Sequence, residues 1–246
     1  MDSPVVHFDV SGPDPETTAK FYSELFGWHT QTFPELSYTM IDTHAGGGIN
    51  GGFAQTGQDQ PSFVTFYAEV PDLQATLDKA ESLGGKTVVP PTEIPNVVTF
   101  AMFTDPQGNV IGIIRGGDQQ GPGVSPGDNP KVDWFEVLGP DPQALWTFYR
   151  DLFGWEIKES SAGGGFAYGQ VQVGEGRGIP GGIGATPDGQ PHVNVYAGVD
   201  DLQRYIDRAD QLGGTTVMPP MKVDEKTSVA VIRDPQGTTF GLYTGM

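Results

Sequence analysis

Few residues in this sequence have side chains suited to acid–base or ligand chemistry. His7 and Asp9 alternate along a short first run, Glu136 holds the place of Asp9 in a later, similar run, and His192 opens another. Imidazole and carboxylate groups act as general acids or bases and as metal ligands. We therefore take His7, Asp9 and Glu136 as candidate catalytic residues without assigning a reaction. The absence of cysteine excludes thiolate metal sites and a cysteine nucleophile.

The sequence repeats itself. HFDVSGPDPETTAKFYSELFGW from residue 7 aligns without a gap to WFEVLGPDPQALWTFYRDLFGW from residue 134, and DPQG recurs near the end of each copy. An identity of this length indicates an internal duplication. The stretch between the copies is rich in Gly, Pro and Asp and lacks periodicity, which is typical of a linker. We predict one domain over 1–116, a linker over 117–131 and a second domain over 132–246.

Each copy predicts the same order of elements, strand–helix–three strands, twice over. In the first copy, Asp14 and Pro15 are typical of a helix start and Gly27 of its end, and a second helix runs from near Asp72 to before Gly84. The strands are predicted at 5–10, 29–33, 37–43, 49–55, 63–70, 86–90, 97–103 and 109–115. The fold class is therefore α+β. The single helix of each βαβββ module covers one sheet face, so two modules form a cup-shaped mixed sheet with helices on the convex face.

Strand alternation predicts which side chains line each cup. Val64, Phe66, Ala68 and Val70 fall on the face expected to pack beneath the helix. Aromatic and polar residues beside glycine fall on the other face, which suits a flat organic ligand. The alternative is that these aromatic side chains merely fill the cup. The predicted ligand-binding residues are His7, Thr65, Tyr67, Gly112, Trp134, Glu136, His192, Asn194, Tyr196, Gly241 and Tyr243.

The motifs GPDPxxxxxFYxxLFGW, DLxxxxxxAxxLGG and DPQGN, which together cover almost all of both copies, resemble the vicinal oxygen chelate superfamily. That superfamily includes glyoxalase I, extradiol dioxygenases and bleomycin-binding proteins. The resemblance implies metal ligands, usually His or Gln with Glu, on the first, fourth, fifth and eighth strands. Those positions here hold mostly other residue types: His7 and Trp134, Gly51, Gly52, Gly181 and Gly182, Thr65 and Asn194, and Gly112 and Gly241. We therefore expect no metal and no cofactor.

The net charge of −18 disfavours binding to nucleic acid, because the phosphate backbone would be repelled. The first residues lack the basic and apolar regions of a signal peptide, and no apolar run is long enough for a membrane span, so we expect neither feature. We expect a cytoplasmic protein whose partner is a small organic molecule. The fused copies are expected to mimic a dimer within one monomer, and a homodimer is the alternative.

Three functions follow from these observations. The first is metal-free binding of a small molecule, such as sequestration of a drug or metabolite. The second is a superfamily enzyme with a degenerate metal site, acting as a lyase, isomerase, hydroxylase or dioxygenase. The third is a regulatory protein-binding module. Because His7 is replaced by Trp134 and Thr65 by Asn194, the two copies are predicted to hold unequal sites.

Overall fold

The computed structural model describes residues 3–57, 60–95, 97–115, 124–160, 165–173, 178–186 and 188–245. The first copy contains β1 (Val5–Gly12), α1 (Pro15–Phe26), β2 (His29–Phe33), the 3-10 turn η1 (Pro34–Leu36), β3 (Tyr38–Asp42), β4 (Asn50–Gln55), β5 (Phe63–Val70), α2 (Leu73–Ser82), β6 (Lys86–Ile94), β7 (Val98–Thr104) and β8 (Val110–Arg115). The second contains β9 (Lys131–Gly139), α3 (Pro142–Phe153), β10 (Glu156–Glu159), β11 (Tyr168–Gln172), β12 (Gly181–Ala185), β13 (His192–Gly198), α4 (Leu202–Gln211), β14 (Thr215–Lys222), β15 (Ser228–Arg233) and β16 (Thr239–Thr244).

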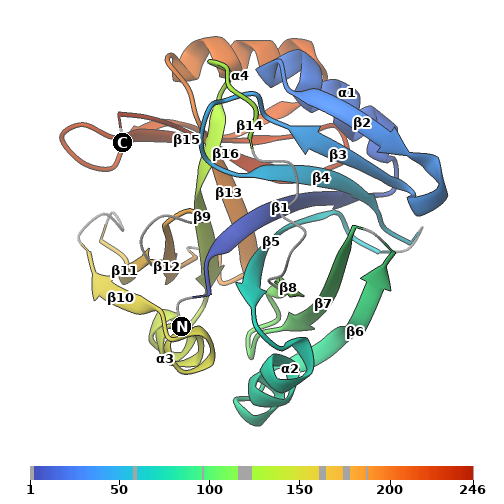
Figure 1. The fold of residues 1–246 in the computed structure, drawn as a ribbon. Coiled ribbons are helices and arrows are strands. Elements are labelled where there is room, and N and C mark those ends of the chain that lie inside the picture. Colours follow the sequence, from blue (N-terminus) through green and yellow to red (C-terminus); the bar gives the residue numbers. More distant parts are fainter. Residues whose placement is uncertain are drawn as a thin grey trace. The chain divides into compact units, whose positions relative to one another are not determined.

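Each copy forms one mixed eight-stranded sheet (Figure 1). The strand order is β2-β3-β4-β1-β5-β8-β7-β6 in the first copy and β10-β11-β12-β9-β13-β16-β15-β14 in the second. Within each module the consecutive strands are antiparallel, whereas β5–β8, β12–β9 and β13–β16 are parallel. The α+β class and the duplicated order of elements predicted from the sequence are confirmed.

The helix boundaries follow the capping residues. Asp14 accepts a hydrogen bond from the backbone N–H of Thr17, and Gly27 ends α1 in the left-handed region, which glycine adopts without a Cβ penalty. The predicted strand 86–90 was too short, because β6 continues through Pro90 and Pro91 to Ile94. This strand lies at the end of the sheet order and has two register shifts, so its proline residues interrupt no central ladder.

The chain divides into two compact units, and each unit takes modules from both copies. Unit 1 comprises residues 1–7, 65–123 and 134–193, and unit 2 comprises residues 8–64, 124–133 and 194–246. In unit 1, Phe66 of the first copy packs against Phe135 and Trp155 of the second. In unit 2, Phe8 and Trp28 of the first copy pack against Phe240 of the second. Each hydrophobic core is therefore shared between the copies.

Two tryptophans at the ends of equivalent helices each bind the segment just before the first strand of the other copy. The indole Nε1 of Trp28 donates to the carbonyl of Pro130 at 2.8 Å in unit 2. The indole Nε1 of Trp155 donates to the carbonyl of Ser3, also at 2.8 Å, in unit 1. Both side chains are almost fully buried, so each indole N–H needs the partner that it has.

The described part of the predicted linker is attached to the first copy. The Ser125 hydroxyl donates to the Asp42 carboxylate, and the amide of Asn129 donates to the carbonyls of Gly27 and Thr43 at 2.9 and 3.1 Å. Residues 116–123 of that segment and its border lie outside the part of the chain described. Within the described ranges, no helix is long and apolar enough to cross a bilayer.

Candidate functional site

The predicted site residues fall into both units. Unit 1 holds His7, Thr65, Tyr67 and Gly112 of the first copy, with Trp134, Glu136 and His192 of the second. Unit 2 holds Asn194, Tyr196, Gly241 and Tyr243. His7, Trp134, Glu136 and His192 are half-buried, and the other side chains of the set are buried. The predicted inner faces are therefore partly filled by their own side chains.

Strand β5 shows how this filling arises. Val64, Phe66, Ala68 and Val70 are buried as alternation predicts, but Thr65 and Tyr67 on the opposite face are buried as well. Thr65 donates its hydroxyl to the carbonyl of Val110 at 2.7 Å, on the neighbouring strand β8. Alternation alone thus did not separate buried from exposed positions on this strand.

A tyrosine ring covers a glycine at the same place in both copies. Tyr67 is paired with Gly112 across the parallel strands β5 and β8, and a Cβ atom at residue 112 would overlap the Tyr67 ring. Tyr196 and Gly241 repeat this arrangement on β13 and β16. These two glycines therefore make room for a tyrosine ring.

A second tyrosine–glycine pair occurs between the third and fourth strands of each copy, and the sequence analysis missed it. In unit 2 the Tyr38 hydroxyl lies over Gly52 and donates to the Asp9 carboxylate at 2.9 Å. In unit 1 the Tyr168 hydroxyl lies over Gly182 and donates to the Glu136 carboxylate at 2.6 Å. The signal was present as a tyrosine in each third strand followed by Gly-Gly in the fourth.

Both histidines that the sequence singled out have a defined neighbour in unit 1. The His7 ring contacts Tyr67 edge-on, with centroids 5.7 Å apart. His192 Nδ1 lies 3.0 Å from the carbonyl oxygen of Gln190, in the turn before β13. His7 is thus part of an aromatic face, and His192 interacts with its own loop.

The second copy carries a polar chain that the first lacks. The Tyr243 hydroxyl donates to Asp133 at 2.5 Å, and Lys131 pairs with the same carboxylate at 2.7 Å. Burial, assisted by this hydrogen bond and by the Asp133 charge, raises the pKa of Tyr243 well above its usual range, so the phenol stays protonated. Val6 and Ile114 stand at the corresponding positions of the first copy. The two copies therefore present different inner faces.

Asn194 adds to this difference. Its side chain is buried, and its Oδ1 atom has no hydrogen-bond partner among the residues that the structure describes. The equivalent residue of the first copy, Thr65, has its carbonyl partner on β8. A buried acceptor without a partner carries a free-energy cost, so it favours a water molecule or ligand that donates to it.

The residues do not fit the metal centre that the family resemblance implies. The eighth-strand and fourth-strand positions are glycines, and in each case an aromatic ring occupies the space of the missing side chain. The ring is a tyrosine at Gly52, Gly112, Gly182 and Gly241 and a phenylalanine at Gly51 and Gly181. Over the residues described, no three His, Asp or Glu side chains come together in an arrangement that could hold a metal ion. No chemical step is therefore assigned to a metal.

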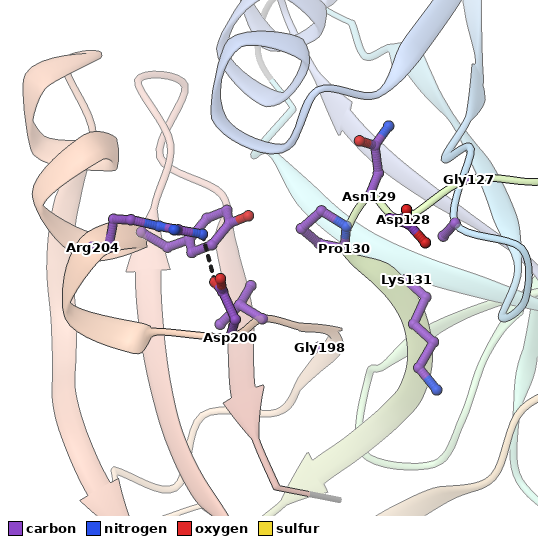
Figure 2. Close-up of a pocket in the computed structure, with 11 residues that line it drawn as sticks. Gly127, Asp128, Asn129, Pro130, Lys131, Gly198, Asp200 and Arg204 are labelled. Atoms are coloured by element: carbon purple, nitrogen blue, oxygen red, sulfur yellow. Dashed lines mark hydrogen bonds and ion pairs between the residues drawn. The ribbon is translucent and has the colours of Figure 1, made fainter.

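A cavity of about 370 Å³ lies within unit 2, and none of the predicted site residues lines it (Figure 2). Asp128, Pro130 and Lys131 line one side, and Asp200, Arg204 and Tyr205 line the other. The sequence analysis did not identify it, because its residues lie in the predicted linker and at the first turn of α4. The signal was a difference between the copies, since Pro71, Ala75 and Thr76 stand where Asp200, Arg204 and Tyr205 occur.

Comparison with protein families gives one match for each copy. Residues 5–113 match the model of the Glyoxalase/Bleomycin resistance protein/Dioxygenase superfamily, and residues 135–243 match that of the Glyoxalase-like domain. The putative glyoxylase CFP32 of Mycobacterium tuberculosis is 25% identical over 241 residues, covering 95% of this chain and 92% of that protein. The anthracycline biosynthesis protein DauV of a Streptomyces species is 26% identical over 268 residues, covering 96% of this chain and 90% of that protein.

Solved structures with the same fold include a metal-bound glyoxalase and a dioxygenase. The Mn(II)-bound glyoxalase from Novosphingobium aromaticivorans superposes with a TM-score of 0.68 at 15% identity, covering 99% of this chain and 82% of that chain. The 2,3-dioxygenase LapB from Pseudomonas sp. KL28 gives the same TM-score and identity, covering 100% and 94%. At this identity the likeness shows the fold alone.

Proposed function

Because the chain belongs to the glyoxalase/bleomycin resistance protein/dioxygenase superfamily, we propose that it binds a small organic molecule on an inner sheet face without a metal ion. The observation that carries this proposal is the repeated tyrosine–glycine pair. Tyr67 and Tyr196 fill the space where a metal-using relative would need a carboxylate. A fold that hosts many reactions can lose its metal and keep its ability to bind ligands.

The inner face of the second copy within unit 1 supports ligand binding best. Trp134 is half-buried on β9, two residues before Glu136, so both side chains lie on one face of the strand. Tyr168 donates to Glu136 and holds its carboxylate in place. An indole ring beside a fixed carboxylate offers stacking and an oriented acceptor, the combination that small-molecule sites use.

The relative named for anthracycline biosynthesis suggests the first ligand class to test. Anthracyclines are planar, polycyclic and rich in hydroxyl and carbonyl groups, and daunorubicin also carries an amine. Such a molecule offers a flat surface to Trp134 and a donor to Glu136. We therefore infer that the ligand is a planar aromatic compound with at least one hydrogen-bond donor.

The test titrates daunorubicin into the purified protein and follows its fluorescence anisotropy with EDTA or with added Mn²⁺, Zn²⁺ or Fe²⁺. We expect the same affinity in every case, and less than stoichiometric metal by mass spectrometry. Trp134→Ala should weaken binding at least tenfold, whereas His7→Ala, at the matching position of the first copy, should not. Stoichiometric metal, or binding that EDTA abolishes, would overturn the proposal.

A thermal-shift screen with aldehydes, glutathione adducts and aromatic antibiotics extends the search beyond anthracyclines. We expect at least one aromatic compound to raise the melting temperature of the protein and not that of Trp134→Ala. A screen in which no compound distinguishes the two proteins would contradict binding at this face.

An acid–base enzyme is the second candidate, favoured by the hydrogen bonds of Tyr38 to Asp9 and of Tyr168 to Glu136. A carboxylate held by a phenol can accept a proton from a bound substrate and later return it. The test is turnover of methylglyoxal with glutathione, with and without added metal. Turnover that Glu136→Gln abolishes at unchanged ligand affinity would support an enzyme, and turnover unaffected by both Glu136→Gln and Asp9→Asn would contradict this mechanism.

A further inference from the structure

We propose that the cavity between residues 127–131 and the start of α4 is a separate binding site for a small zwitterionic aromatic compound, such as an aromatic amino acid. All of its lining belongs to unit 2. Its volume of about 370 Å³ falls within the range of roughly 300–1,000 Å³ that is typical of small-molecule sites. This site is distinct from the sheet face proposed above.

The wall formed by the segment 127–131 is held in place by the first copy. The Asn129 amide donates to two carbonyls of that copy, those of Gly27 and Thr43. Next to it, Pro130 is buried and accepts the indole N–H of Trp28. The wall is therefore preformed, and a ligand would not need to order it.

The opposite wall is built around Arg204. Its guanidinium group lies 5.1 Å from the centre of the Tyr205 ring and pairs with Asp200 at 2.5 Å. Figure 2 shows Arg204 and Asp200 on one side of the cavity and Pro130 on the other. The side chains of Arg204 and Asp200 are 60% and 69% exposed, so their ion pair is weak and a ligand carboxylate can share the guanidinium group.

Helix α4 does not need Asp200, Arg204 or Tyr205 in order to form or to pack on the sheet. Both α2 and α4 begin with a capping aspartate, Asp72 or Asp201, and both bury apolar residues at the same three positions. The first copy nevertheless has Pro71, Ala75 and Thr76 in place of Asp200, Arg204 and Tyr205. The Arg204–Asp200 ion pair beside the Tyr205 ring therefore has no counterpart in the first copy, and all three residues line the cavity.

The lining indicates the ligand class. Two cationic side chains, Lys131 and Arg204, are balanced by two carboxylates, Asp128 and Asp200. Lys131 and Arg204 are both paired, but the partner of Lys131, Asp133, is only 19% exposed, whereas both members of the Arg204–Asp200 pair are open to solvent. We therefore take Arg204 as the group for an anion and Asp128 as the group for an ammonium ion. The rings of Pro130 and Tyr205 offer apolar surfaces to a ligand ring. A molecule with both charges and one ring matches this lining better than a simple acid or amine.

The experiment compares three probes that share one ring: L-phenylalanine, 3-phenylpropionate and phenethylamine. Each is titrated into the full-length ¹⁵N-labelled protein, and the shifts of the Gly127 and Gly198 amides locate binding, since both residues line the cavity. We expect L-phenylalanine to bind at least tenfold more tightly than either singly charged probe. Arg204→Gln and Asp128→Asn should each weaken it tenfold or more.

Arg208→Gln is the matched control, because it removes the same charge from the same exposed face of α4, one turn beyond the cavity. It should leave L-phenylalanine affinity unchanged, as should Trp134→Ala, which alters only the sheet face in unit 1. The proposal is overturned if Arg208→Gln weakens binding as much as Arg204→Gln, if the singly charged probes bind equally well, or if no probe shifts these amides at millimolar concentration.

Discussion

At the residue scale, glycine decides which side chains occupy the inner faces of the sheets. Tyr67 can lie on β8 only because residue 112 has no Cβ, and the Tyr38 hydroxyl reaches Asp9 only by passing over Gly52. The same pairs recur in the second copy. Because these glycines accommodate tyrosine, they are packing positions as much as lost ligand positions.

Gly112→Ala should therefore destabilise the protein. The new methyl group would overlap the Tyr67 ring, and overpacking of this kind costs about 1–3 kcal/mol. Gly47→Ala is the control, because a Cβ there meets no heavy atom within 4 Å. Urea unfolding should show a lower midpoint for Gly112→Ala alone, and a Gly112→Ala/Tyr67→Ala double variant should cost less than the sum of its parts. Equal midpoints for the two alanine variants would contradict the packing role.

Tyr38→Phe should also lower stability, by about 1.5–3 kcal/mol, because it removes the hydroxyl that donates to the buried Asp9 carboxylate. Asp9 is only 5% exposed, so water can replace the lost hydroxyl poorly. Tyr168→Phe should cost less, since Glu136 is half-buried and more accessible to water. Chemical denaturation of both variants measures their free energies of unfolding. A larger loss of stability for Tyr168→Phe than for Tyr38→Phe would contradict the role assigned to burial.

Alternation along a strand predicts which residues share a face, but it does not predict their contacts. Alternation placed Tyr67 and Tyr196 on the inner faces, and the structure describes them on the strands expected. It did not reveal Tyr38 or Tyr168 as partners of Asp9 and Glu136, because that pairing depends on strand register and on the reach of a phenol over glycine. Neither quantity follows from a periodicity of two.

At the element scale, the Asp-Pro-Gln-Gly turn between β7 and β8 is attached to the core of unit 1. Asp105 accepts hydrogen bonds from the backbone N–H groups of Gln107, Gly108 and Asn109, and from the Tyr149 hydroxyl of the second copy. Burial nevertheless raises the pKa of Asp105, against the opposing effect of these hydrogen bonds. The Asp105 carboxylate is thus fixed in position by its hydrogen bonds, although burial disfavours its charged form.

This effect of burial predicts an unusual pH dependence. A raised pKa means that the folded state binds the proton more readily than the unfolded chain, so stability rises as pH falls through the folded pKa toward the unfolded value of about 3.9. We subtract the free energy of unfolding of Asp105→Asn from that of the wild type. This difference should increase as the pH is lowered from 7 to 4. Chemical denaturation across that range measures it.

Asp224→Asn provides a control of opposite sign. Hydrogen bonds from the backbone of Thr227 and Lys226 lower the pKa of Asp224, so its contribution is present above about pH 3.9 and is lost as pH falls through the folded pKa. The wild-type advantage over Asp224→Asn should decrease below pH 4. If both variants show the same slope, the burial of Asp105 does not control its titration.

Most elements were predictable because their signals are local. Asp14 and Gly27 fix the ends of α1 within the residues that the sequence indicated, since capping depends on neighbours three or four positions away. The length of β6 was not predictable, because Pro90 and Pro91 are tolerated only at a sheet edge. Whether a strand lies at an edge is decided by pairing with distant segments.

At the scale of the whole molecule, the cores do not follow the order of the sequence. Phe66 packs on Phe135 in unit 1 and Phe8 packs on Phe240 in unit 2, so each copy completes its cores with the other copy. The duplication is plain in the sequence. The exchange of core residues between the copies cannot be read from the sequence. The corresponding modules of the two copies have similar apolar faces, and these do not specify which module each face covers.

The exchange predicts that neither copy folds alone as a monomer. Residues 1–116 without the second copy would expose Phe66 and Phe103, and residues 132–246 would expose Phe135 and Phe240, all of them fully buried in the structure. Each fragment should be unfolded or self-associated by light scattering and circular dichroism, and an equimolar mixture should recover a cooperative melt. A fragment that melts cooperatively as a monomer would contradict the shared cores.

The shared cores also constrain how this gene can change over time. A substitution at Phe66 alters the space available to Phe135, which lies 69 positions away in the other repeat. Correlated variation among descendants of the duplication should therefore link the second quarter of the chain with the third, and the first with the fourth. Two repeats that descend from one ancestor would then diverge as interdependent partners.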